Sequence, residues 1–282
     1  MIKLAKINLY DYYNTEINFS NEKNRDYLEN LIRKIEGEEN IIDFKEQLLA
    51  ITQLYHDGLI SSPVQEQKWK SQRETLDKLI KAGKISIRQF YSGEGIDMNQ
   101  VREIILPSAE QILEYGNTSR KAKSRYLNYR EGDIQNFGLI LQEELKAKTI
   151  DPTSLMCIAN GGFEPAYLAM NLTNIDDLIV ARYSHVKEND SQLMIPDYQQ
   201  KKDFKEKIKK EILIINDCID TGKTASSVIF SILPLKPRKL FFASVEGNSK
   251  NISKKIKKIK KINIHKSRPF ISEIVCNNFK SN

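Results

Sequence analysis

Apolar side chains recur in two different patterns along this chain, and the change between them falls near residue 118. Before that point, apolar residues recur at helical spacing in three segments, 43–56, 65–82 and 98–115. Beyond it, short apolar runs alternate with helical segments. The pattern predicts a mostly helical accessory domain, residues 1–117, followed by an α/β domain, residues 118–282.

The helical domain carries less information about function. Pro107 should interrupt its last helical segment, because proline lacks the backbone N–H that a helix interior uses. Residues 85–90 are expected to form a strand. The sequence of residues 54–60, together with the helix that follows, is compatible with a winged-helix module. The alternative is an ordinary helical packing or oligomerisation domain.

In the second domain, the alternation of elements predicts a mainly parallel sheet with helices on both faces. Ligands bind such sheets beyond the carboxyl ends of the strands. A long polar stretch, residues 184–210, is expected to form a mobile loop over the reacting centre. The expected strands are 155–158, 178–183, 212–215, 239–245 and 262–266, and the expected helices are 133–148, 165–172, 225–233 and a basic one around 252–259.

The most informative stretch is residues 212–224, which reads Ile-Leu-Ile-Ile-Asn-Asp-Cys-Ile-Asp-Thr-Gly-Lys-Thr. Four apolar residues suit a strand buried on both faces, and Asn216 and Asp217 form a polar edge directly after it. The loop 220–224 leads into a helix, whose N-terminal N–H groups and dipole favour a phosphate. Gly222 lets the backbone approach that phosphate closely. The stretch therefore predicts a site for a phosphorylated sugar, with the polar edge accepting hydrogen bonds from sugar hydroxyls.

Two common nucleotide-binding motifs are excluded for this loop. A Walker A motif ends in the same Gly-Lys-Thr sequence, but it requires a glycine at the position that Asp217 occupies here. A dinucleotide-binding fingerprint needs three glycines at fixed spacing, and Gly222 is the one glycine of this stretch.

A second stretch has the same strand, turn and helix order. The apolar run 155–158 is followed by Asn160, Gly161 and Gly162, and then by a helical segment from Pro165. Glycines leave backbone N–H groups accessible, so an anion can lie against them. The alternative is a plain turn between a strand and a helix, for which two glycines are also common.

Together the two stretches resemble the signature of the type I phosphoribosyltransferases, which bind phosphoribosyl diphosphate (PRPP). In that family, four apolar residues and two acids precede the loop that binds the sugar phosphate, and a double-glycine turn binds pyrophosphate. The sequence of residues 219–224 is close to that of the purine-salvage members of the family. The resemblance implies an enzyme, a pentosyltransferase, that transfers the 5-phosphoribosyl group of PRPP to a nitrogenous base and releases pyrophosphate.

The resemblance also implies a role for each matching residue. Asn216 and Asp217 would hold the ribose hydroxyls, and Asp220 would help to move the proton of the incoming base or, alternatively, cap the following turn. The 5′-phosphate would bind to Thr221, Gly222, Lys223 and Thr224, and the pyrophosphate to Asn160, Gly161 and Gly162. Magnesium is implied as a cofactor, held mainly through the oxygens of PRPP rather than by the protein.

Three positions depart from the family pattern. Asn216 replaces an acid, Asn160 stands where many members have a lysine or arginine, and Asn248 falls near where some purine enzymes have a lysine. A second hypothesis is therefore a regulatory protein that senses PRPP or a nucleotide and acts on a partner through residues 1–117. A third is a different reaction on a ribosyl phosphate, such as cleavage of an N-glycosidic bond.

The formal net charge of +7 is unevenly distributed. Residues 247–268 contain nine lysines or arginines and no acids. Such a block is typical of a surface that binds nucleic acid, but its isoleucines recur at helical spacing, which favours an amphipathic helix with a solvated basic face. A nucleic-acid or protein partner at this segment or at residues 1–117 is left open, as is a homo-oligomer.

The remaining composition concerns location. The three cysteines, Cys157, Cys218 and Cys276, have neither metal-ligand spacing nor a paired framework, which favours a reducing compartment. No apolar run approaches the length of about 20 residues that spans a bilayer. We expect a cytoplasmic protein without a membrane partner.

Overall fold

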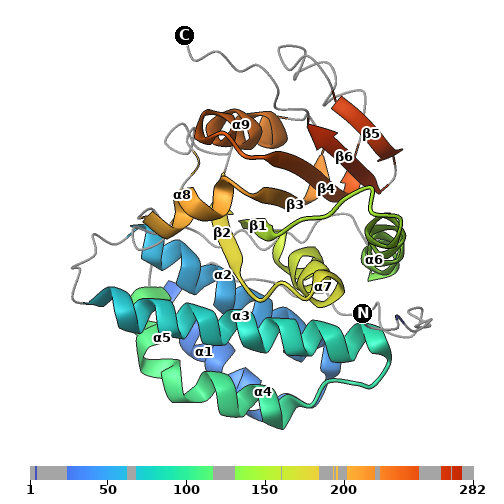
Figure 1. Ribbon diagram of the computed structural model, residues 1–282. Helices are drawn as coiled ribbons and strands as arrows, with labels where there is room; N and C mark the ends of the chain where they lie inside the picture. Colours follow the sequence, from blue (N-terminus) through green and yellow to red (C-terminus); the bar gives the residue numbers. More distant parts are fainter. Residues whose placement is uncertain are drawn as a thin grey trace. The chain divides into compact units, whose positions relative to one another are not determined.

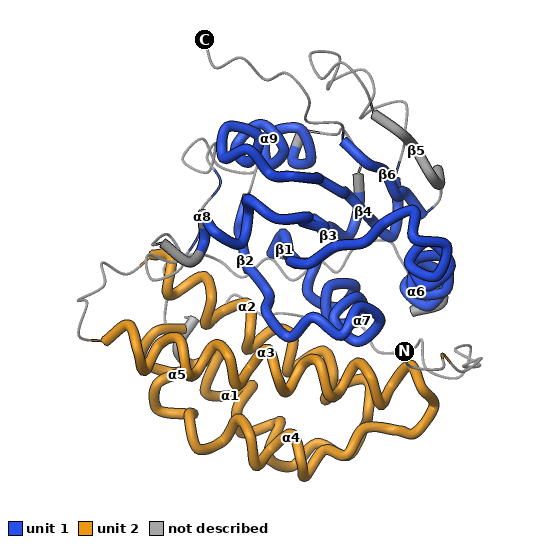
Figure 2. The backbone as a smooth tube through the Cα atoms, viewed as in Figure 1, with its two compact units in different colours: residues 1, 128–195, 199–282 blue, residues 2–127, 196–198 orange. Residues whose placement is uncertain are grey.

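A computed structural model of the chain describes residues 4, 24–61, 68–116, 131–159, 161–183, 193, 195, 202–219, 223–247, 262–267 and 269–274. By its internal contacts the chain separates into two compact units, which Figure 2 colours differently. A helical unit comprises residues 2–127 and 196–198, and an α/β unit comprises residues 1, 128–195 and 199–282.

The described part of the helical unit contains five α-helices and one 3₁₀ turn (Figure 1). These elements are α1 (Asn24–Gly37), α2 (Ile41–Ser61), α3 (Trp69–Ser92), α4 (Met98–Ile105), the turn η3 (Leu106–Ser108) and α5 (Ala109–Gly116). Pro107 lies in the 3₁₀ turn, so the predicted interruption is confirmed. The strand predicted at 85–90 is wrong, because α3 continues through it. Residues 54–60 lie within α2, and no strand occurs among the described residues of this unit, which gives no support to a winged helix.

Local signals in the sequence set several of these helix ends. The side chain of Asn40 accepts hydrogen bonds from the N–H groups of Ile42 (2.9 Å) and Asp43 (3.2 Å), which caps the start of α2. Asp97 caps α4 in the same way through the N–H of Gln100 (3.0 Å). Helix α3 ends at Ser92, and the next residue, Gly93, caps it with a φ of 78° that is favourable for glycine.

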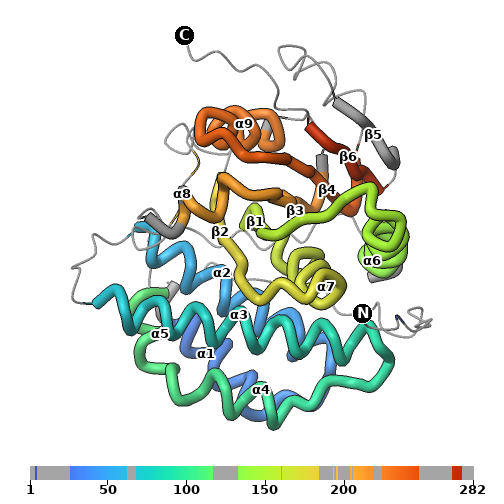
Figure 3. The backbone as a smooth tube through the Cα atoms, in the orientation of Figure 1, coloured from blue at the N-terminus to red at the C-terminus, as the bar shows by residue number. Residues whose placement is uncertain are grey.

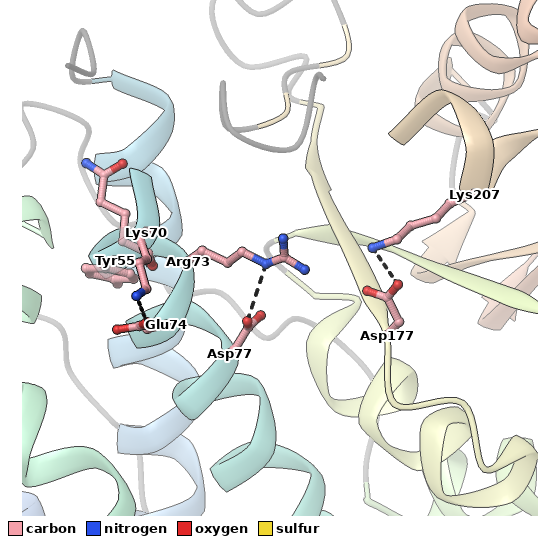
Figure 4. A network of polar contacts seen from close by, with 8 residues as sticks. Tyr55, Lys70, Arg73, Glu74, Asp77, Asp177 and Lys207 are labelled. Atoms are coloured by element: carbon pink, nitrogen blue, oxygen red, sulfur yellow. Dashed lines mark hydrogen bonds and ion pairs between the residues drawn. The ribbon is translucent and has the colours of Figure 1, made fainter. Parts of the chain in front are cut away.

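Helix α3 has one face exposed to the solvent and another buried in the core of its unit, and Figure 4 shows the ion pairs of the exposed face. On the exposed face, Lys70 pairs with Glu74 at 4.0 Å and Arg73 with Asp77 at 3.6 Å. On the buried face, the backbone carbonyl of Gln72 accepts a hydrogen bond from the hydroxyl of Tyr55 on α2 (3.3 Å). Exposed pairs of this kind contribute at most about 1 kcal/mol, so apolar packing holds the unit together.

The α/β unit is built on a six-stranded sheet with the order β2-β1-β3-β4-β6-β5 (Figure 1). Four strands are mutually parallel, β6 is antiparallel to β4, and β5 is antiparallel to β6. The mainly parallel sheet agrees with the sequence pattern, whereas β6 was not predicted. The strands are β1 (Ser154–Ala159), β2 (Leu178–Arg182), β3 (Glu211–Ile219), β4 (Lys239–Gly247), β5 (Ile262–Ser267) and β6 (Phe270–Ile274).

Helices cover both faces of this sheet. On one face, α8 (Lys202–Ile208) and α9 (Lys223–Ile232) pack on a continuous apolar cluster. Its strand residues are Met156, Ile158, Ile179, Ala181, Ile212, Ile214, Leu240, Phe242, Phe270 and Ile274. On the other face, α7 (Phe163–Thr173) contacts β1 and β3, and α6 (Glu131–Lys146) contacts β4. Both β1 and β2 are buried throughout, as is usual for strands with helices on each side.

The polar stretch 184–210 contains more structure than the predicted loop. Helix α8 occupies its last third, and Ile195 is buried in the apolar cluster on the α9 face. Lys207 of α8 forms an ion pair with Asp177, the residue before β2 (Figure 4). The expected basic helix lies outside the described residues, and residues 262–267 at the end of the basic block form β5.

Candidate functional site

The order of the strands singles out one place at the edge of the sheet. From β1 the chain crosses to β2 on one side, and then returns to β3 on the other side of β1. Parallel sheets of this kind bind ligands at such a reversal, beyond the carboxyl ends of the two strands. Gly161 and Gly162 follow β1, and Asp217 lies near the end of β3. The fold therefore brings the two stretches from the sequence analysis to one place.

The double-glycine turn, Gly161 and Gly162, lies directly against β3. A Cβ atom on Gly161 would overlap the carboxyl group of Asp217. A Cβ atom on Gly162 would come within 3.0 Å of the carbonyl oxygen of Ile215 and within 2.5 Å of that of Ile158. Because Gly162 has an ordinary φ of −78°, glycine is needed at this position for space rather than for an unusual backbone conformation.

The turn leads straight into α7. The N–H of Gly162 donates to the carbonyl of Ile158 (3.2 Å), and the carbonyl of Gly162 accepts from the N–H of Ala166 (3.0 Å). The N–H of Gly162 is thus already used within the protein, contrary to the expectation that both glycines leave this group accessible. An anion at the turn would therefore depend on other donors.

Strand β3 extends further than its neighbour β1. Its pairing with β1 ends at Cys157 and Ile215, whereas its pairing with β4 continues to Ile219 and Gly247. Residues 216–219 therefore have a strand neighbour on the β4 side, and the double-glycine turn lies on the β1 side. Since side chains alternate along a strand, Asn216 shares the α9 face with Ile214, and Asp217 shares the α7 face with Ile215.

Asp217 is a half-buried carboxyl group whose environment opposes its charge. Burial raises its pKa above the ordinary value of 3.8, and hydrogen bonds from the N–H of Cys218 and from its own N–H partly offset this rise. The neighbouring thiol of Cys157 has its pKa raised well above the usual value, first by burial and then by the negative charge of Asp217. The site therefore contains a carboxylate that an incoming hydroxyl or cation would stabilise.

Asn216 is buried, and its side chain points along its own strand toward the C-terminal end. Its Nδ2 donates a hydrogen bond to the carbonyl oxygen of Cys218 (2.8 Å). On the neighbouring strand, the hydroxyl of Ser244 donates to the carbonyl of Glu246 (2.8 Å). Asn216 is the register partner of Ser244, and Cys218 that of Glu246, so the same bond occurs at the same height on β3 and β4.

Arg182 is a basic residue of this edge that the sequence analysis missed. It is the last residue of β2, it is buried, and its register partner is Ala159 at the end of β1. Strand alternation places it on the α7 face, the face of Asp217, because Ala181 belongs to the cluster on the other face. A signal was present in the sequence: an arginine directly after a four-residue apolar run, at a predicted carboxyl end.

The next residue connects this edge to α9. The hydroxyl of Tyr183 donates to the hydroxyl oxygen of Ser227 at 2.8 Å. Helix α9 begins at Lys223, with Thr224 in its first turn. Asn160, Asp220, Thr221 and Gly222 lie outside the described residues, so their placement stays a prediction.

Two further features of the described residues concern cofactors and membranes. Among the described residues, there is no group of three or more histidine, cysteine, aspartate or glutamate side chains that could hold a metal ion. None of the helices in the described part of the chain has the length and apolar character needed to cross a bilayer.

Comparison with known proteins gives a distant likeness. No protein-family profile matches the chain, and no curated protein matches its sequence. Among solved structures, it is similar to the hypoxanthine phosphoribosyltransferase of Trypanosoma cruzi, which was studied for the role of its C-terminal region in oligomeric state and enzymatic activity. The match has 16% sequence identity, covers 48% of this chain and 74% of that chain, and has a TM-score of 0.31. This likeness is too low to assign a family.

Proposed function

We propose that this protein binds PRPP and transfers its 5-phosphoribosyl group to a nitrogenous base, with release of pyrophosphate. The observation that carries the proposal is the contact between Gly161 and the carboxyl group of Asp217 at the reversal of strand order. Two stretches that resemble the two PRPP-binding motifs of type I phosphoribosyltransferases are far apart in the sequence and meet there. This is the relation that a ligand with a ribose and a pyrophosphate group requires.

In the proposed reaction, each end of PRPP has its own contact. Asp217 accepts hydrogen bonds from the ribose hydroxyls, and the double-glycine turn lies next to the pyrophosphate. The start of α9, with Lys223 and Thr224, faces the 5′-phosphate, because a helix N-terminus favours an anion. A base nitrogen attacks the anomeric carbon with inversion while the carbon–oxygen bond to pyrophosphate breaks and the electron pair leaves with the pyrophosphate. Asp220 is the candidate acceptor for the proton that the base loses.

The protein would contribute position and charge rather than a covalent intermediate. The negative charge of Asp217 favours the positive charge that develops on the ribose as pyrophosphate leaves. Magnesium suits the oxygens of PRPP, and its role would be to neutralise the leaving group.

Arg182 provides a test of where the pyrophosphate lies. Replacing Arg182 with glutamine should weaken the binding of PRPP by about ten- to a hundredfold, because a charge-assisted hydrogen bond contributes about 1.5–3 kcal/mol. Titration calorimetry with PRPP and with ribose 5-phosphate measures this, and the loss should be larger for PRPP. The matched control is Arg238→Gln, because the exposed Arg238 pairs with Glu211 at the opposite end of the sheet and should leave affinity unchanged. Equal losses in both variants would contradict the assignment.

The proposed function is tested by incubating the protein with PRPP, Mg²⁺ and each common purine or pyrimidine base, and measuring pyrophosphate. We expect pyrophosphate to appear only when a particular base is present, together with the corresponding nucleotide. Binding of PRPP without any pyrophosphate would support the sensing hypothesis instead. A flat calorimetric titration with both PRPP and ribose 5-phosphate would refute both.

A further inference from the structure

We propose that Asn216 is a positioning residue: its amide holds the backbone of Cys218, and through it the carboxylate of Asp217, in place against Gly161. The family pattern has an acid at this position, so from the sequence alone the asparagine is interpreted as the loss of a catalytic group. The geometry assigns it a different role, in which the amide is required. The functional consequence rests on the proposed role of Asp217 in PRPP binding, and the structural part does not.

The bond between Asn216 and Cys218 depends on the donor chemistry of an amide. Asn216, which is itself buried, donates through Nδ2 to the carbonyl oxygen of the half-buried Cys218 at 2.8 Å. A carboxylate has no hydrogen to donate and would place a negative charge against that carbonyl oxygen. An aspartate here would therefore lose the bond and introduce repulsion in a place with little water to screen it.

Cys218 also connects Asn216 to Asp217. The N–H of Cys218 donates to the carboxyl group of Asp217, while the C=O of Cys218 accepts from Asn216. Both backbone groups of Cys218 are thus engaged by the two preceding side chains, one on each face of the sheet. If the carbonyl is released, Cys218 gains rotational freedom and its N–H no longer has a fixed direction toward Asp217.

Such a bond is needed because this end of β3 is paired on one side only. Pairing with β1 stops at Ile215, so residues 216–219 are paired with β4 alone. The bond from Ser244 to the carbonyl of Glu246 has the same form on β4, at the register partners of Asn216 and Cys218. Side-chain bonds therefore fix both strand ends beyond the point where β1 leaves.

The experiment compares Asn216→Leu, Asn216→Asp and Asn216→Ser with Ser244→Ala as the matched control. The leucine variant removes the donor at similar size, and the serine variant keeps a donor. The first measurement is hydrogen exchange of the Cys218 amide by NMR, without any ligand. We expect exchange to become at least about tenfold faster with leucine or aspartate, because a hydrogen bond to a charged group is lost, and to stay near wild type with serine. Unchanged exchange in the leucine variant would overturn the structural part of the inference.

The second measurement is the affinity for PRPP, alone and combined with Asp217→Asn. We expect leucine and aspartate at position 216 to weaken binding by about tenfold in the wild-type background and to have no further effect once Asp217 is replaced. Ser244→Ala should reduce thermal stability but leave affinity near wild type, which separates positioning from general loosening. A gain of affinity or turnover with Asn216→Asp would overturn the inference. If wild type binds no PRPP, the proposed function fails while the exchange result still decides the role of Asn216.

Discussion

Replacing Asp217 with asparagine is expected to reduce turnover of PRPP by roughly a hundredfold or more, the usual cost of removing one electrostatic group from a reacting centre. In the proposed reaction, the carboxylate is the charge that accepts hydrogen bonds from the ribose hydroxyls and favours a cationic sugar, and an amide of the same size cannot provide it. Because burial raises the pKa of Asp217, activity in the wild type should increase as the pH rises through that pKa. Pyrophosphate release as a function of pH measures both effects. Retention of more than half of the activity in the variant would remove Asp217 from the mechanism.

The same substitution should make the folded protein more stable at neutral pH. A carboxyl group whose pKa is higher in the folded state than its ordinary 3.8 opposes folding once it is ionised. Below the ordinary pKa, the group is protonated in both states and the two proteins should unfold alike. As the pH rises through the folded-state pKa, the wild type alone loses stability. Thermal unfolding of both proteins between acidic and neutral pH measures the difference, and a variant that unfolds at lower temperature near pH 7 would contradict the expectation.

Replacing Gly161 with alanine should disrupt the site by changing the double-glycine turn instead of the carboxylate that it contacts. The added methyl group would occupy the position of the Asp217 carboxyl, so either the turn or the carboxylate has to move. Overpacking of this kind costs about 1–3 kcal/mol of the free energy of unfolding. In the proposed reaction, a displaced carboxylate would no longer contact the ribose, so we expect turnover to fall by roughly a hundredfold. Gly37→Ala, at the end of α1, is the matched control, because no atom lies within 4 Å of the added methyl group.

A double-mutant cycle distinguishes this specific collision from general damage. In a protein that already carries Asp217→Ala, the space beside Gly161 is larger, so Gly161→Ala should cost much less stability. Chemical denaturation of the four proteins gives the coupling free energy, which is about 0.5–3 kcal/mol for residues in contact. Purely additive effects would show that the two groups do not meet in solution.

The part of the fold that could be predicted from the sequence is the part with continuous apolar runs. Strands β1 and β3 are buried on both faces, and such strands are recognisable without knowledge of their neighbours. Residues 85–90 show the limit of this reasoning, because Ile85, Ile87 and Phe90 fit both a strand and a helix. These residues are helical because they belong to α3, which begins at Trp69 and continues through them. Within this helix, the hydroxyl of Ser86 donates to the carbonyl of Ala82 (2.9 Å).

The parts of the site that could not be predicted depend on register between distant segments. Asn216 and Asp217 were predicted as a polar pair after the strand, but only the pairing of β3 with β4 shows that the strand continues through both residues, which places their side chains on opposite faces. Arg182 lies at this edge of the sheet because its register partner is Ala159 at the end of β1. This pairing joins two separate strands, so the sequence alone does not reveal it. Strand β6 was missed for the same reason, since its place is set by antiparallel pairing with β4.

The extension of β3 beyond β1 also constrains how related chains can differ. Each residue added or removed between Ile215 and the following loop would exchange the two sides of the sheet for everything after it. A single residue inserted directly before Asn216 would put the acid on the α9 face and the amide on the face of the glycines. Length changes at this point are therefore compatible with the site only in even numbers, and homologues that keep the chemistry should show that parity.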